Sequence, residues 1–306
     1  MTLSKCITRT NETRATLEFT VECHGEEESH RRPASGASSA TWDRVYEYTP
    51  APGQFINELV SGGFTGTETT PEAAVAYAEE RMRKNTWVSL GGWGGYLVVG
   101  FSSPVPENGG GELLIRGNSF NNSSEPGVVY VMQDENGNGL PDDTWYELRG
   151  SEYDRSTHDY AITYTRPSGA NQPVAWRDRN GEMGKIARIG EHTQESYYPA
   201  WVEADELSFT GVRLPENLDE KEVDGTMSWT TTPFAWGYAD NYSSQDLING
   251  YNTLSIANAV TADGSPANLQ SIDFVKVQSG VNASAPLIGE VSTDVCGVAC
   301  YRNVTE

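Results

Sequence analysis

Short apolar runs, several of them alternating with polar residues, recur along the chain after residue 87. The clearest are Tyr96–Phe101 and Ile272–Val277. Others of similar length are Leu113–Ile115, Val128–Met132, Trp145–Leu148, Tyr160–Tyr164, Glu206–Phe209 and Asn252–Ile256. Runs of this length, bounded by glycine, proline, asparagine and aspartate, are typical of β-strands. The pattern predicts an all-β protein, a jelly-roll-like β-sandwich with long loops.

One segment has the pattern of a helix instead. Thr70 is a suitable N-cap, Pro71 suits the first helical position, and Glu72 complements the positive end of the helix dipole. The apolar residues that share one predicted face are Val75, Ala78 and Met82. We therefore expect one short helix that covers an edge or end of a sheet.

The first forty residues differ from the rest. Ala15–Val21 alternates as a strand does, and residues 24–40 combine a run of glutamates with a Ser/Ala/Gly stretch that is typical of a linker. We expect residues 1–40 to be an N-terminal arm and linker and residues 41–306 to be the main domain. The arm is either the last strand of a preceding domain or disordered.

The charge balance narrows the classes of partner. The chain has 21 basic and 43 acidic residues and a formal net charge of −22, which repels phosphate backbones and anionic lipids. We therefore expect no nucleic-acid partner. No apolar run approaches the roughly 18 residues of a membrane span, and Met1 leads directly into polar residues. Either the protein is cytosolic or its first residue marks a boundary that follows a removed signal or anchor, and we expect the second.

Cysteines occur only near the two ends of the chain. They are Cys6, Cys23, Cys296 and Cys300. An even number indicates disulfide bonds if the protein resides in an oxidising compartment, and all three possible connectivities remain open.

The segment from Asp134 to Asp142 carries the most specific chemical pattern. Gly139 stands at the sixth position, where a calcium loop needs a sharp turn. The oxygen ligands at positions 1, 3, 5, 7 and 9 would come from Asp134, Asn136, Asn138, the Leu140 carbonyl and Asp142. Asp143 or Glu147 could add another oxygen. The sequence predicts a structural calcium site; the alternative is a metal-free hairpin turn, because Asn-Gly favours turns by itself.

Aromatic residues beside polar ones form the second notable pattern. Trp93 lies among four glycines, Trp201 belongs to a Tyr-Tyr-Pro-Ala-Trp cluster, and a third group begins at Trp236. We expect the ligand-binding residues to be Trp93, Trp201, Trp236, Tyr238, Asp240 and Asn241, because exposed rings beside oriented polar groups suit sugars or flat macrocycles. The alternative is that these rings plug the ends of the sandwich. No catalytic set is evident, so we expect no enzymatic activity.

Several longer strings are distinctive enough to suggest a family. They are Val45–Asn57, Gly94–Phe101, Glu125–Val129, Asp134–Leu148, Gly150–Tyr153, Trp236–Asn241 and Ile272–Gln278. Together they resemble, over about residues 45–295, a family of cell-surface proteins from gut Bacteroidetes and related bacteria. Its members are often lipoproteins with an Ig-like or PKD-like domain upstream, so the resemblance implies that the N-terminal arm is a remnant of such a domain.

That family is similar to surface lipoproteins encoded beside vitamin B12 transporters, some of which bind cobamides. The resemblance implies a protein on the exterior of the outer membrane that captures a cobamide for a TonB-dependent transporter. Two alternatives remain open. One is a calcium-dependent glycan-binding module, and the other is a glycoside hydrolase or another hydrolase, which would show two carboxylates facing each other across a cleft.

Overall fold

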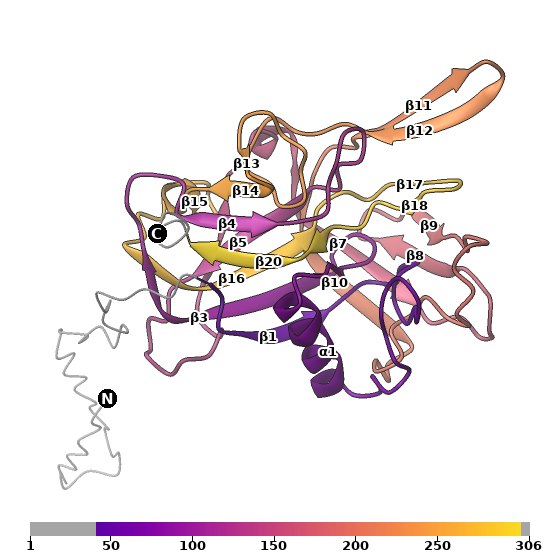
Figure 1. Cartoon of the computed structure of the whole chain (residues 1–306), viewed down its shortest axis with the longest axis horizontal. Helices are drawn as coiled ribbons and strands as arrows, with labels where there is room; N and C mark the ends of the chain where they lie inside the picture. The colour runs from indigo at the N-terminus through magenta and orange to yellow at the C-terminus, as the bar shows by residue number, and fades with distance from the viewer. Residues whose placement is uncertain (1–40, 301–306) are drawn as a thin grey trace, which may run out of the picture. The chain divides into compact units, whose positions relative to one another are not determined.

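A six-stranded antiparallel sheet lies at the centre of the computed structural model, which describes residues 41–300 (Figure 1). Its strands, in spatial order, are β1 (Arg44–Thr49), β3 (Tyr96–Pro106), β16 (Ser271–Ser279), β5 (Gly127–Met132), β6 (Trp145–Leu148) and β15 (Ala259–Val260). Strand β16 pairs with β3 on one side and β5 on the other, so that Val277 lies between Leu97 and Val129.

A second, four-stranded sheet packs against one face of the first. Its order is β13 (Leu247–Ile248), β14 (Tyr251–Leu254), β4 (Leu113–Arg116) and β20 (Gly297–Cys300). Buried side chains of both sheets form one core, including Leu97, Val99, Val275, Val277, Leu113, Ile115, Leu254 and Val298. The chain passes repeatedly between the two sheets, from β3 to β4 to β5 and later from β14 to β16 to β20, as in a jelly roll.

Helix α1 (Pro71–Arg83) lies beside β1 and closes one side of this core (Figure 1). The Thr70 hydroxyl accepts a hydrogen bond from the backbone N–H of Ala73 at 3.2 Å, which caps the first turn. The buried residues of the helix are Ala74, Tyr77, Ala78 and Met82. The predicted start, the cap and the buried positions of Ala78 and Met82 are confirmed, whereas Val75 is only partly buried.

A third sheet has its own core. It consists of β10 (Glu206–Arg213), β7 (Thr157–Thr165), β8 (Val174–Asp178) and β9 (Met183–Ile186). Tyr160, Tyr164 and Phe209 from this sheet surround Trp93. The glycines around Trp93 allow the backbone to approach closely: Gly91 has φ 69°, and a Cβ there would lie 2.0 Å from the carbonyl oxygen of Ala51.

The remaining elements are short. The strand pairs are β11 (Leu218–Val223) with β12 (Thr226–Thr231), β17 (Ser284–Ala285) with β18 (Gly289–Glu290), and β19 (Asp294–Val295) with β2 (Val88–Ser89). Two 3₁₀ turns, η1 (Tyr153–Arg155) and η2 (Ile256–Asn258), complete the described elements. The β11–β12 hairpin extends away from the sheets (Figure 1), and Asp224 and Gly225 form its turn with positive φ angles.

The prediction of an all-β sandwich with one short α-helix is confirmed. The predicted arm and linker over residues 1–40, with Cys6 and Cys23, lie outside the described residues. Within residues 41–300, the structure contains no helix with the length and apolar character needed to cross a bilayer.

The Thr70 cap provides a test of the helix assignment. Thr70→Ala removes the acceptor for the Ala73 N–H and should lower the free energy of unfolding by about 1 kcal/mol. Urea denaturation would measure the change. Thr69→Ala is the matched control, because Thr69 is exposed and precedes the cap. Equal stability of the two variants would contradict a capping role for Thr70.

Candidate functional site

The predicted calcium loop joins β5 to β6, and two buried carboxylates, those of Asp134 and Asp273, hold its start. Asp134 has no exposed surface, and its Oδ2 accepts a hydrogen bond from the N–H of Gly139 at 2.9 Å. The N–H of Asp134 itself donates to Oδ2 of Asp273 on β16 at 2.9 Å. The first position of the loop is thus bound to its own sixth position and to the central strand.

Two asparagines coil the loop between these points. Oδ1 of Asn136 accepts from the N–H of Asn138 at 2.9 Å, and Oδ1 of Asn138 accepts from the N–H of Leu140 at 2.7 Å. Both are Asx turns, in which the side chain takes the place of a backbone acceptor. They repeat at the alternate positions from which a calcium loop supplies its ligands.

The carboxylates around this coil lie within reach of its amides. Asp142 accepts from Nδ2 of Asn136 at 3.0 Å and from Nδ2 of Asn138 at 2.9 Å, and these two hydrogen bonds lower the pKa of Asp142. Asp143 accepts from the N–H of Glu135 at 2.9 Å. Oδ1 of Asp134, by contrast, is buried and has no hydrogen-bond partner among the described residues. A buried, unpaired carboxylate oxygen is costly unless a cation or water satisfies it.

The donor set therefore suits a hard cation that takes oxygen ligands. Within residues 41–300, no three His, Cys, Asp or Glu side chains come close enough together to hold a metal ion. A bound calcium would depend on the amide oxygens and the Leu140 carbonyl as well as on Asp134 and Asp142. Asp143 lies at the loop, whereas Glu147 pairs with His158 instead.

Sequence reasoning did not identify Asp273 as a support of the loop. It is separated from Asp134 by 139 residues, and only the pairing of β16 with β5 brings the two together. The one indication in the sequence was that Asp273 is a polar residue within the predicted strand Ile272–Val277.

Of the six residues predicted to bind a ligand, Trp236 lines a cavity. This Trp236 cavity has a volume of about 430 Å³. Its lining is Gly111, Leu148, Arg149, Trp236, Gly237, Gln245, Asp246, Ile248, Thr253, Leu254, Ser255 and Asn258. The indole is half-buried, so one part of the ring remains accessible.

The other two tryptophans are core residues, which agrees with the alternative that such rings plug the sandwich. Trp93 is 1% exposed and packs edge-on against Tyr160 with 4.7 Å between ring centroids. Trp201 is 5% exposed and stacks on Phe64 at 5.8 Å. The expectation that these rings are exposed in loops is wrong, because the third sheet covers Trp93 and the α1 side of the core encloses Trp201.

Tyr238, Asp240 and Asn241 are also buried, and their polar groups bind the backbone. The Tyr238 hydroxyl accepts from the N–H of Glu152 at 2.9 Å. Asn241 donates to the carbonyl of Phe234 at 2.9 Å and accepts from its N–H at the same distance. These contacts fold the 234–242 loop and thereby position Trp236, so the expected exposure of these three residues is wrong as well.

Asp240 belongs to a group of buried carboxyl groups. Its Oδ1 accepts from the N–H groups of Asn118 and Ser119, and its Oδ2 accepts from the N–H of Asp294 at 2.9 Å. Burial raises the pKa of Asp240 to about 7. Burial and the charge of Asp240 raise the pKa of Asp294, and burial with the charges of Asp294 and Asp240 raises that of Glu125.

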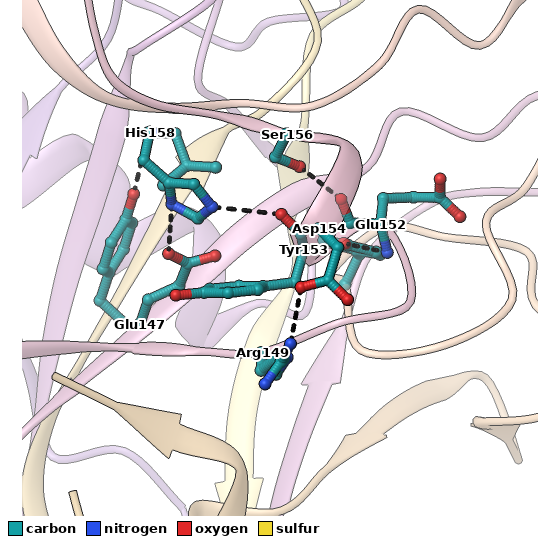
Figure 2. Close-up of polar contacts among 10 residues, drawn as sticks. Glu147, Arg149, Glu152, Tyr153, Asp154, Ser156 and His158 are labelled. Atoms are coloured by element: carbon teal, nitrogen blue, oxygen red, sulfur yellow. Dashed lines mark hydrogen bonds and ion pairs between the residues drawn. The ribbon is translucent and has the colours of Figure 1, made fainter. Parts of the chain in front are cut away.

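Arg149, one of the residues that line the Trp236 cavity, also belongs to a polar network, which Figure 2 shows. Arg149, which lines the cavity, donates to Oδ1 of Asp154 at 2.7 Å, and its guanidinium lies 4.4 Å from the ring centroid of Tyr153. In the same figure Glu147 and His158 point toward each other, with 3.3 Å between Oε2 and Nδ1. The other ring nitrogen of His158 lies 3.1 Å from the carbonyl oxygen of Tyr153.

The carboxyl group of Glu147 has an unusually high pKa. Burial raises its pKa to about 7, although His158 opposes the shift. The sequence suggested Glu147 only as an additional calcium ligand and gave no sign of its pairing with His158. Asp246 is the one carboxylate among the described residues that line the Trp236 cavity, so this cavity does not present the facing pair that a glycosidase uses.

Removing calcium should destabilise the protein. Calcium at a hundredfold excess over its Kd would stabilise the fold by about 2.7 kcal/mol, a rise of roughly 5–10 °C in Tm, and a chelator should abolish this rise. Asp142→Ala should lose the calcium-dependent shift without loss of a buried group, because Asp142 is exposed. Glu135→Ala is the control, since Glu135 is an exposed acid outside the predicted ligand set. Identical melting with chelator and with calcium would contradict the site.

The buried carboxyl groups predict a dependence of stability on pH. Asp240 and Glu290 have pKa values raised to about 7, so the folded state binds more protons than the unfolded state above about pH 4. Their stabilisation is present at low pH and is lost as the pH rises through 7. The Tm should therefore fall from about pH 5 to about pH 8. Asp294→Asn should weaken this fall in Tm, because it removes another buried carboxyl group with a raised pKa. Glu216→Gln, at an exposed site, should leave the fall unchanged. A Tm that rises with pH would refute the raised pKa values of these carboxyl groups.

Comparison with known proteins does not identify a family. No protein-family model matches the chain, and no curated protein is similar to it.

Proposed function

We propose that this protein is an extracytoplasmic binding protein that captures a ring-shaped ligand at the Trp236 cavity, and that this ligand is a cobamide. The observation that carries the proposal is the half-exposed indole of Trp236 in a cavity of about 430 Å³. The resemblance to cobamide-binding surface lipoproteins supports the choice of ligand. We propose binding rather than catalysis as the activity of this cavity.

The lining of the cavity combines two properties that such a ligand needs. Leu148, Ile248 and Leu254 give apolar contact beside the indole, while Arg149 and Gln245 offer hydrogen bonds at the rim. A corrin is an approximately flat macrocycle fringed with amide groups. Its face would stack on the tryptophan and its amides would bind the rim. The cavity is small for a whole corrinoid, so one edge would enter and the remainder would lie across the rim.

The cavity is also held in place before a ligand arrives. Asp154 and Tyr153 fix the guanidinium of Arg149 on one side. Asp246 accepts from the N–H of Gly237 at 2.6 Å and so fixes the backbone next to Trp236. A preorganised site loses less conformational entropy on binding than a mobile one.

The calcium loop would support the same site indirectly. The loop precedes β6, and the residues at the end of that strand, Leu148 and Arg149, line the cavity. A calcium ion between Asp134 and Asp142 would therefore brace the strand that supplies part of the cavity wall. We propose that the protein acts at the cell surface and passes its ligand to a TonB-dependent transporter.

A glycan is the second candidate ligand. The volume of the Trp236 cavity is at the small end of the range for ligand sites and suits one or two sugar rings more closely than a complete corrinoid. Stacking on Trp236 and hydrogen bonds at the rim would serve a neutral sugar equally well.

Gel filtration with cyanocobalamin tests the leading proposal. At micromolar concentrations the red colour should co-elute with the protein. Trp236→Ala should weaken binding at least about tenfold, or about 1.4 kcal/mol, because it removes the stacking surface. Trp229→Ala is the matched control, since Trp229 is a half-buried tryptophan on β12 outside the cavity lining.

The Tm of both variants would show whether a loss of binding reflects a loss of fold. Colour that never co-elutes with the wild type would reject the cobamide. Binding of neutral oligosaccharides that depends on Trp236, without binding of cyanocobalamin, would support the glycan instead.

A further inference from the structure

A second pocket lies on the opposite face of the central sheet from the sandwich core. Its volume is about 260 Å³. Its lining, which we call the Lys276 pocket, is Glu47, Tyr96, Val98, Trp145, Ser208, Phe209, Thr210, Lys276 and Gln278. Trp145 and Leu148 on β6 point to opposite sides of the strand, because their positions differ by an odd number. The Lys276 pocket and the Trp236 cavity are therefore separate sites.

The register of the central sheet aligns residues from five strands on the face that carries this pocket. Lys276 on β16 pairs with Val98 on β3 and with Tyr130 on β5. Val98 pairs in turn with Glu47, and Tyr130 pairs with Glu147. Directly paired residues place their side chains on one face. A row of polar and aromatic side chains therefore crosses the sheet with Lys276 at its centre.

The ammonium group of Lys276 has aromatic neighbours and no acid in contact with it. Nζ lies 4.4 Å from the ring centroid of Tyr130, 5.2 Å from that of Trp145 and 5.7 Å from that of Tyr96. Among the described residues it forms no ion pair and no hydrogen bond. Glu47, the nearest acidic side chain of the pocket, accepts from the Tyr96 hydroxyl at 3.0 Å.

Burial has a clear consequence for this lysine. It lowers the pKa of Lys276 to about 8, and the charge of Glu47 opposes the shift only in part. The group remains protonated at neutral pH, although the fold disfavours its charge. The titratable groups that face it are Glu47, Tyr96 and Tyr130, with Glu147 further along the same row.

The rest of the lining supplies both donors and acceptors. Gln278 donates to the carbonyls of Gly94 at 2.8 Å and Thr210 at 3.1 Å, while its Oε1 is buried without a hydrogen-bond partner among the described residues. Ser208 and Thr210 are exposed at the mouth. Rings beside hydroxyl, amide and carboxylate groups suit a polyhydroxylated ligand.

We propose that the Lys276 pocket binds a sugar unit that carries a carboxylate, such as a uronic acid. The carboxylate would pair with the Lys276 ammonium and form the charge-assisted hydrogen bonds that the protein does not supply. The sugar hydroxyls would bind Glu47 and the exposed hydroxyl groups of Ser208 and Thr210, and the ring would pack beside Trp145 and Tyr96. This site goes beyond the proposed function, because it uses none of the residues of the Trp236 cavity.

Titration of the whole protein with D-glucuronate tests this assignment. D-Glucose is the matched probe, because it has the same ring without the carboxylate. NMR shifts at the pocket should show millimolar binding of glucuronate and at least tenfold weaker binding of glucose. Binding should weaken between pH 7 and pH 9, as Lys276 loses its proton.

Lys276→Met separates the role of the lysine in binding from any role in folding. Methionine has a similar length without the charge, so the variant should lose glucuronate binding at least tenfold. Its Tm should equal that of the wild type or exceed it by up to about 4 °C. The reason is that the substitution removes a partly buried ammonium that has no anionic partner within residues 41–300. Lys185→Met, which changes an exposed lysine on β9, should alter neither property.

Each contrary result overturns the proposal. Equal binding of glucuronate and glucose would remove the role of the carboxylate, and unchanged binding by Lys276→Met would remove that of the lysine. No binding to the wild type at millimolar glucuronate would reject the site. Melting of Lys276→Met well below the wild type would show that Lys276 supports the fold and is not kept for a ligand.

Discussion

Strand β16 is hydrogen-bonded along both edges, and this double pairing decides on which face each side chain of the central sheet lies. Val275 and Val277 enter the core shared with the second sheet, while Lys276 and Gln278 face the third sheet. A slip of one residue would exchange the two sets and bury the lysine within an aliphatic core. The aliphatic residues therefore fix the register, and the register in turn fixes the position of the polar ones.

The fold of the sheets and loops removes many polar groups from contact with water. The Asp240 carboxyl accepts from the backbone N–H groups of Asn118 and Asp294, and the Asp294 carboxyl accepts from the Asn118 side-chain amide. Lys276 lies among aromatic rings. Burial disfavours the charged form of each group, so it raises the pKa of Asp240 and Asp294 and lowers the pKa of Lys276. The first two have a clear structural purpose, since they tie loops together. Within residues 41–300, Lys276 has no comparable partner, which is why we assign it to a ligand.

The sequence predicted well those features that depend on neighbours in the chain. Trp145–Leu148 coincides with β6, and Thr70 caps the helix as expected, because strand patterns and caps are local properties. The Asx turns at Asn136 and Asn138 are local too. By contrast, the stretch after Phe101 continues β3 to Pro106, and the hairpin β11–β12 was not predicted, since its polar, exposed strands lack an apolar run.

The candidate sites were predictable only in part, because they depend on contacts between distant segments. Trp93 and Trp236 both lie beside glycines in the sequence, yet the third sheet buries the first and leaves the second at a cavity. A lysine within an alternating strand normally faces water, so nothing in the Ile272–Val277 run indicated that β10 would cover Lys276. Asp273 was hidden in the same run.

The face of β16 turned away from the sandwich core partly buries the Lys276 ammonium, with no acid in contact with it among residues 41–300. NMR titration of the Lys276 side chain, with selective assignment through Lys276→Met, would measure the consequence of this burial. Desolvation predicts that the pKa of Lys276 is lowered to about 8. A pKa near 10.5, the ordinary value for lysine, would show that water or an anion solvates the ammonium, and it would refute the assignment of Lys276 to a ligand.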